Sequence, residues 1–135
     1  MDSRLQGDNQ TKIAGALGLE PGDFDVLNYA GPSLWMADPH EPSHEAAFRW
    51  QFENVCLNAH SVKRVGLVGH ANCGGFALKG APQTVPEEKA VIVASLQNAK
   101  AKLAKDYPQI EFIPAFVTIG SQPSKGLPEI SVEVL

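Results

Sequence analysis

The feature that most constrains the fold is an apolar run, residues 65–68 (VGLV), that leads directly into GHANCGG at residues 69–75. A short apolar run bounded by glycine is typical of a buried β-strand. His70 and Cys73 follow this strand three residues apart, and a helical turn between them would direct both side chains at one metal ion. Imidazole nitrogen and thiolate sulfur are both good zinc ligands. The two glycines that follow Cys73 would let the backbone bend tightly and turn amide N–H groups toward a thiolate or an anion.

Strands and helices are predicted to alternate along the chain. Apolar residues at helical spacing predict helices over 11–19, 43–59 and 86–107 and a helical turn over 74–78. Ser43 is the expected N-cap of the second helix, and Pro86 suits the first turn of the third. Strands are predicted over 24–30, 65–69, 110–119 and 130–135, with a turn at 20–23 and a proline- and histidine-rich loop from Pro32 to Pro42. This alternation is typical of an α/β fold, here a three-layer domain with a mostly parallel sheet. Pro114 has no backbone N–H to donate to a neighbouring strand, which predicts that it lies in an edge strand or at a bulge.

Length and charge limit the classes of function. The 135 residues predict one domain, 1–135, and an apolar content of 44% supports a core. With 15 acidic and 11 basic residues the net charge is −4, which argues against nucleic acid or an anionic membrane as partner. No apolar stretch approaches the ~20 residues of a membrane span, and the first residues lack the apolar core of a signal peptide. A cytoplasmic protein without membrane partners is therefore expected.

The two cysteines are expected to be reduced and to differ in role. Cys56 lies at helical spacing with Phe48 and Phe52, so we expect it to pack in the core. Cys73 is the candidate for chemistry. The other histidines are assigned no chemistry: His40 and His44 are expected in a loop, and His60 near a helix end. Trp35 and Trp50 are expected to pack in the core or at an interface.

Four short motifs occur in order in the first 75 residues: DSRL (2–5), GLEPGD (18–23), NYAG (28–31) and GHANCGG (69–75). An aspartate and an arginine two residues apart can form a carboxylate–guanidinium pair. Together, the motifs resemble in order and spacing those of the β-class carbonic anhydrases, which carry C-x-D-S-R, a G-x-x-x-G-D turn, a strand ending R-N-A-G, and G-H-x-x-C-G. The resemblance covers a little over half of the chain.

The resemblance implies a zinc site and a reaction. In that family two cysteines and a histidine bind zinc, and the Asp–Arg pair either orients the zinc-bound water or lets the aspartate bind the metal. Carried over to this chain, His70 and Cys73 are metal ligands, and Asp2 and Arg4 form the pair, with Asp2 also able to serve as a ligand. The implied activity is that of a lyase, the reversible hydration of carbon dioxide to bicarbonate. The family also forms dimers, which implies a homodimer or a higher homo-oligomer.

The chain departs from the family pattern at its start. The family's first cysteine falls directly before the position of Met1, and the apolar strand that should lead to it is not in the sequence. The recorded chain could begin internally, another segment could take that place, or the protein could be a degenerate member of the family. NYAG also differs from R-N-A-G at its first two positions.

Three functions follow as alternatives. The first is a zinc lyase of the carbonic anhydrase kind. The second is a non-catalytic relative with a structural or small-ligand-binding role, which the missing cysteine favours. The third uses Cys73 as a nucleophile with a lowered pKa, although no dedicated base for it is evident. Without the first cysteine, His70, Cys73 and Asp2 could still hold zinc, and Asp2 would then be unable to orient a hydroxide.

Overall fold

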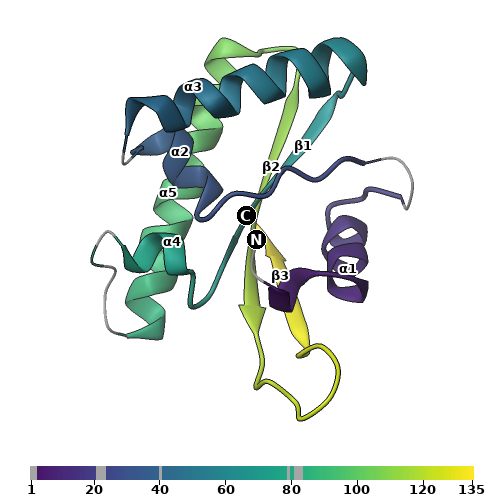
Figure 1. The fold of residues 1–135 in the computed structure, drawn as a ribbon, viewed down its shortest axis with the longest axis vertical. Coiled ribbons are helices and arrows are strands. Elements are labelled where there is room, and N and C mark those ends of the chain that lie inside the picture. Colours follow the sequence, from purple (N-terminus) through teal and green to yellow (C-terminus); the bar gives the residue numbers. More distant parts are fainter. Residues whose placement is uncertain (1–2, 21–23, 40, 79, 81–83) are drawn as a thin grey trace.

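The computed structural model describes residues 3–20, 24–39, 41–78, 80 and 84–135 (Figure 1). They form a small α/β domain with a mixed three-stranded sheet. In chain order the elements are η1 (Ser3–Leu5), α1 (Asp8–Ala16), α2 (Pro32–Ala37), α3 (Pro42–Gln51), the π-helical η2 (Phe52–Ala59), β1 (Arg64–His70), α4 (Gly74–Ala77), α5 (Val85–Asp106), β2 (Glu111–Ile119) and β3 (Ile130–Val134).

The strand order is β1-β2-β3, with β1 parallel to β2 and β2 antiparallel to β3. The prediction of a mostly parallel sheet is therefore wrong for the described strands, since one of the two pairings is antiparallel. The reason is the connection: a loop without a helix joins β2 to β3, and a parallel return would need a crossover of a dozen or more residues.

Pro114 lies in the central strand, contrary to the expectation of an edge or a bulge. Its carbonyl accepts a hydrogen bond from the N–H of Leu135, so its backbone faces the β3 side of β2. The ladder with β3 begins at the next residue, Ala115, which pairs with Val134. The missing donor therefore falls where the β3 ladder ends, and the ladder with β1 is unaffected.

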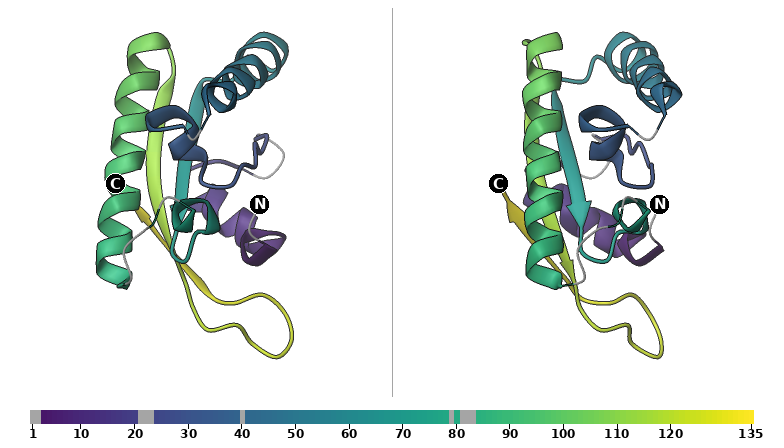
Figure 2. Two further views of the ribbon diagram at one scale, coloured as in Figure 1. Left: turned by 60° about the vertical axis from the view of Figure 1, so that its left-hand side comes forward. Right: turned by 90° about the vertical axis from the view of Figure 1, so that its left-hand side faces the viewer.

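Helices pack on both faces of the sheet (Figure 1). α5 runs along β1 and β2 on one face, with α2 beside it, and α1 lies on the other face (Figure 2). A Cβ atom on Gly69 would come within 2.5 Å of Ile92 in α5, and one on Gly66 within 2.5 Å of Leu17 after α1. These glycines let helices on opposite faces approach the strand closely.

The longest helix, α5, buries one apolar stripe against the sheet. Ile92, Leu96, Ala99 and Leu103 have no exposed surface, and they recur at the spacing of one helix face. Among the described residues, no helix is both long and apolar enough to cross a membrane.

The segment expected to be a loop after Pro32 contains a helix, α2. Gly31 precedes it with a left-handed φ of 63°, and Pro32 occupies the first helical turn, where its fixed φ favours helix formation. The next helix also begins with a proline, Pro42, so the cap position is Glu41 rather than the expected Ser43. That helix continues through η2 to Ala59, as predicted.

The predicted strand over 24–30 is not formed. The segment lacks β-ladder pairing, because none of the strands in the described part of the chain lies beside it to supply hydrogen bonds. The turn expected at 20–23 extends into 21–23, outside the described residues.

Candidate functional site

The structure brings His70 and Cys73 together at the end of β1. Asn72 between them adopts a left-handed φ of 55°, which reverses the chain after the strand. Cys73 then becomes the N-cap residue of α4. Both side chains are buried, and the imidazole of His70 hydrogen-bonds the thiol of Cys73. A nitrogen and a sulfur donor therefore lie side by side, shielded from water.

The surroundings of Cys73 favour the thiolate. Burial alone would raise the pKa of the thiol. The hydrogen bond and the charge of His70, with backbone N–H groups of Phe76 and Gly75, outweigh burial and lower the pKa below its ordinary value. A metal binds the thiolate rather than the thiol, so this environment prepares the sulfur for a cation.

The orientation of His70 is set by its own turn. Its Nδ1 lies 2.9 Å from the carbonyl oxygen of Ala71, which can only accept, so Nδ1 carries the proton in the neutral ring. In that tautomer Nε2 carries the lone pair that a metal ion would bind. Histidines that bind metals commonly donate their other N–H in this way.

Two side chains from distant parts of the sequence hold the turn between His70 and Cys73. Glu88 of α5 accepts hydrogen bonds from the backbone N–H of Asn72 at 2.9 Å and of Cys73 at 3.2 Å. Arg4 donates from Nη2 to the carbonyl oxygen of Asn72 at 3.2 Å. The N–H groups are thus bound from the helix side and the carbonyl from the N-terminal side.

Sequence reasoning did not find Glu88. Acidic residues are common in the first turn of a helix because they interact favourably with its dipole, so nothing in the local pattern distinguishes Glu88 from Glu87. The distinguishing property is burial: Glu88 is 9% exposed. The burial of Glu88 arises only from the packing of α5 against the end of β1.

The two glycines after Cys73, Gly74 and Gly75, do not form the tight bend that the sequence predicts. Neither has a positive φ, and the tight bend occurs at Asn72 instead. Gly75 is required for a close approach, since a Cβ atom there would lie 2.7 Å from the backbone of Ala30 and of Gly31. A Cβ atom on Gly74 would meet nothing within 4 Å.

This difference gives a matched pair of substitutions. Gly75→Ala is expected to lower the free energy of unfolding by about 1–3 kcal/mol, because the backbone at 30–31 would have to move to admit a methyl group. Gly74→Ala is expected to be neutral or slightly stabilising, since alanine favours a helix over glycine. Urea unfolding of both variants measures the difference. Equal stabilities would show that α4 does not pack against 30–31 this tightly.

The remaining candidate residues are placed as follows. Asp2 lies outside the described residues, so its position relative to His70 stays a prediction. Cys56 packs in the core with Phe48 and Phe52, as expected. His60 hydrogen-bonds the carboxylate of Asp25, and His44 stacks on Trp35 with ring centroids 4.5 Å apart. His40 also lies outside the described residues.

Within the described part of the chain, no three His, Cys, Asp or Glu side chains cluster as a metal site would require.

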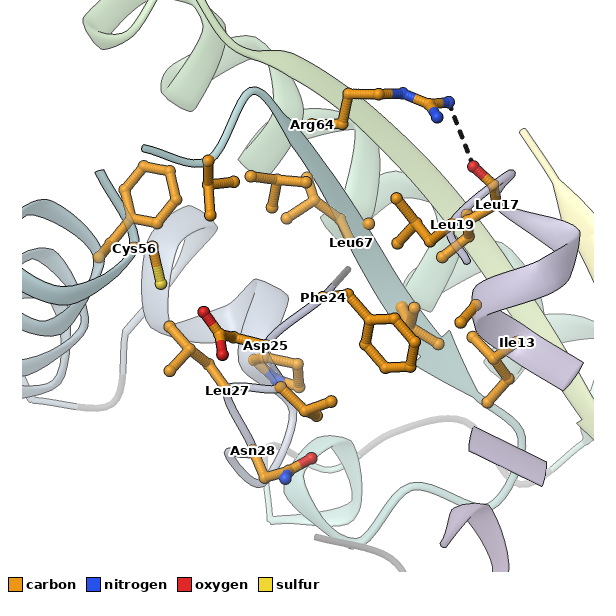
Figure 3. A pocket seen from close by; sticks show the side chains of 18 of the residues that line it. Ile13, Leu17, Leu19, Phe24, Asp25, Leu27, Asn28, Cys56, Arg64 and Leu67 are labelled. Atoms are coloured by element: carbon orange, nitrogen blue, oxygen red, sulfur yellow. Dashed lines mark hydrogen bonds between the residues drawn. The ribbon is translucent and has the colours of Figure 1, made fainter. Parts of the chain in front are cut away.

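A cavity of about 770 Å³ opens beside β1 and reaches His70 (Figure 3). Side chains of α1, α2 and η2 form two of its walls, and the segment 24–29 lies across from the strand. Most of the labelled side chains in Figure 3 that point toward the space are apolar, among them Ile13, Leu67 and Phe24. Asp25 and Arg64, which also line the cavity, are exposed at its rim.

Comparison with known proteins adds no relative. No protein-family model matches the chain, and neither a curated protein nor a solved structure matches it.

Proposed function

We propose that this chain is a β-carbonic-anhydrase-like, three-layer α/β domain that binds zinc through His70 and Cys73. The observation that carries the proposal is the contact between these two buried side chains, with the thiol pKa lowered by the imidazole. Arg4, from the DSRL motif, lies at the same turn through its bond to Asn72. Two motifs that are 64 residues or more apart in the sequence therefore meet, as the resemblance to that family requires.

The donor set fits zinc as part of a site. Imidazole nitrogen and thiolate sulfur are two of the ligands that zinc prefers, and Asp2 is the proposed third. When bound, zinc would lower the pKa of its water to about 7 and supply hydroxide for the hydration of carbon dioxide. Cys73 would neutralise part of the cation's charge, and the bond from His70 Nδ1 to Ala71 would hold the ring in the orientation that presents Nε2. Arg4 would keep Asp2 ionised.

The test is to quantify zinc in protein purified without a chelator and to measure carbon dioxide hydration with and without added zinc. We expect close to one zinc per chain and slow hydration, since Asp2 cannot both bind the metal and orient a hydroxide. A zinc content near zero, even after zinc is added, would defeat the proposal.

The second candidate is a non-catalytic relative that binds a ligand. The cavity beside β1 favours it, because about 770 Å³ of mainly apolar space far exceeds what carbon dioxide needs and falls in the range of ligand-binding pockets. Zinc binding without measurable hydration would select this second function.

A further inference from the structure

The outward face of α5 carries no charge over most of its length. A helix that packs by one face normally exposes charged side chains on the other. In the left view of Figure 2, α5 forms the outer edge of the molecule, with the sheet on its inner side. Between Glu87 and Lys105, a stretch that the structure describes completely, the exposed positions are all uncharged: Ala90, Val91, Ala94, Gln97, Asn98 and Ala101.

Six exposed residues of this face follow the spacing of a helix-pairing seam. Steps of four and three alternate along them, which is the heptad spacing of two helices that pack side by side along their length. At 1.5 Å per residue the strip is about 27 Å long. We call these residues the α5 seam: Glu87, Val91, Ala94, Asn98, Ala101 and Lys105.

The two ends of the α5 seam carry opposite charges. Glu87 lies in the first turn of α5 and Lys105 in its last turn, and both are exposed. One carboxylate oxygen of Glu87 accepts from the hydroxyl of Thr84, and a carboxylate has a second oxygen with which to accept. Other charged side chains of α5 already bond groups of this chain: Glu88 at the turn after β1, Lys89 with Glu133, Lys102 with Glu45, and Asp106 with Arg49.

The α5 seam is complementary to itself in one orientation. Two copies of α5 can run antiparallel about a two-fold axis near Leu96, which places Glu87 of each copy opposite Lys105 of the other. The same register sets Val91 opposite Ala101 and Ala94 opposite Asn98, and symmetry makes every contact occur twice. A parallel pair would instead place like charges together at both ends. The charges of the seam therefore select the antiparallel arrangement.

We propose that the α5 seam is the contact surface of a homodimer in which α5 of one copy packs antiparallel on α5 of a second copy. An uncharged centre with charges at the rim is typical of protein interfaces. The alanines at positions 94 and 101 let the helix axes approach to about 8–10 Å. One helix pair is a small interface, so we expect a weak dimer. The proposal is independent of zinc, because the α5 seam contains none of the proposed ligands.

The experiment reverses the charges at the ends of the α5 seam and follows the full chain by sedimentation velocity at about 1 μM to about 1 mM. We expect the unmodified chain to dimerise as its concentration rises. Lys105→Glu and Glu87→Lys each place like charges opposite one another at both ends of the dimer, so each should weaken self-association at least about tenfold. An equimolar mixture of the two variants restores both contacts between opposite charges. The mixture should therefore dimerise as tightly as the unmodified chain, to within about threefold.

Lys12→Glu is the matched control. It reverses an exposed lysine of α1, on the other face of the sheet, with the same change in net charge as Lys105→Glu, and it should leave the dimer unchanged. Circular dichroism establishes that each variant is folded. The double variant that carries Glu87→Lys and Lys105→Glu together should dimerise like the unmodified chain, because it exchanges the two charges of the seam.

Three results would overturn the proposal. An unmodified chain that stays monomeric up to about 1 mM would leave this face of α5 to a different occupant. Equal weakening by Lys12→Glu and Lys105→Glu would mean that net charge, and not the α5 seam, controls association. Folded variants whose mixture stays monomeric would show that the dimer does not use antiparallel α5 contacts. The series is run with a zinc chelator and again with zinc, and the same dimer is expected in both, so a failure of zinc binding leaves this test intact.

Discussion

Cys73→Ala is expected to lower the zinc affinity of the protein by two to three orders of magnitude. Zinc sites with four ligands in small peptides are stabilised by roughly 10–16 kcal/mol, so one ligand contributes about 3–4 kcal/mol, and 1.4 kcal/mol is a tenfold change. His70→Ala should have a similar effect, because the two side chains would hold the same ion. Competition with a chromophoric chelator measures both affinities.

The chain supplies a control for each substitution. Cys56→Ala removes the other thiol, which packs in the core with Phe52, and His60→Ala removes an exposed imidazole. Neither should change zinc affinity by more than about twofold, once circular dichroism has shown that each variant is folded. If Cys56→Ala lowers the affinity as much as Cys73→Ala does, the assignment of the site to β1 and α4 is wrong.

Glu88→Ala is expected to be the most damaging substitution near the site that removes no proposed ligand. It would remove the acceptor of two backbone N–H groups, that of Asn72 in a part-buried bond and that of Cys73 in a buried bond. Each lost bond to a charged group costs about 1.5–3 kcal/mol, so the free energy of unfolding should fall by roughly 3–5 kcal/mol. Zinc affinity should also fall 10- to 100-fold, as it does when groups that orient ligands are removed.

Glu87→Ala is the matched control. Glu87 lies in the same helical turn, is exposed, and bonds only the hydroxyl of Thr84 among the described residues. Both substitutions remove the same favourable charge at the start of α5, about 0.3–1 kcal/mol, so the excess loss in Glu88→Ala isolates the two hydrogen bonds from Glu88 to the turn. Urea unfolding at neutral pH gives the comparison. If the two variants are equally stable, Glu88 does not support the turn.

Much of the secondary structure could be predicted from local patterns. The strands at 65–69 and 110–119, the helical turn at 74–78 and the helix starting near Pro86 all occur close to the expected residues. Each carries its own signal, either an apolar run or a helical repeat. The short helix after Pro32 was missed, because a proline-rich segment indicates a loop and a helix start equally well.

The segment 24–30 shows the limit of such patterns. Its apolar residues, Phe24, Val26 and Leu27, fit a strand, yet a strand exists only where a neighbour supplies hydrogen bonds. In the structure a cavity lies where that neighbour would be. No property of residues 24–30 themselves contains this information.

The residues of the candidate site also fall into two groups, those whose contact a local pattern predicts and those that only packing brings together. The three-residue spacing of His70 and Cys73 after a strand was enough to predict that they meet, because the contact is local. Arg4 and Glu88 reach the same turn from 68 residues before Asn72 and 16 residues after it. The motif resemblance singled out Arg4, but it contained nothing about Glu88.

The amino-acid sequence by itself predicted the elements that carry a local signal: the apolar strand near 65–69, the helical turn at 74–78 and the helix that starts near Pro86. The tertiary structure alone decided which edge of the sheet stays unpaired, that Pro114 lies in the central strand, and that Glu88 rather than Glu87 is buried. The physical reason is that hydrogen-bond pairing between strands and the burial of a carboxylate depend on groups far apart in the chain. Their proximity exists only once helices and strands have packed together.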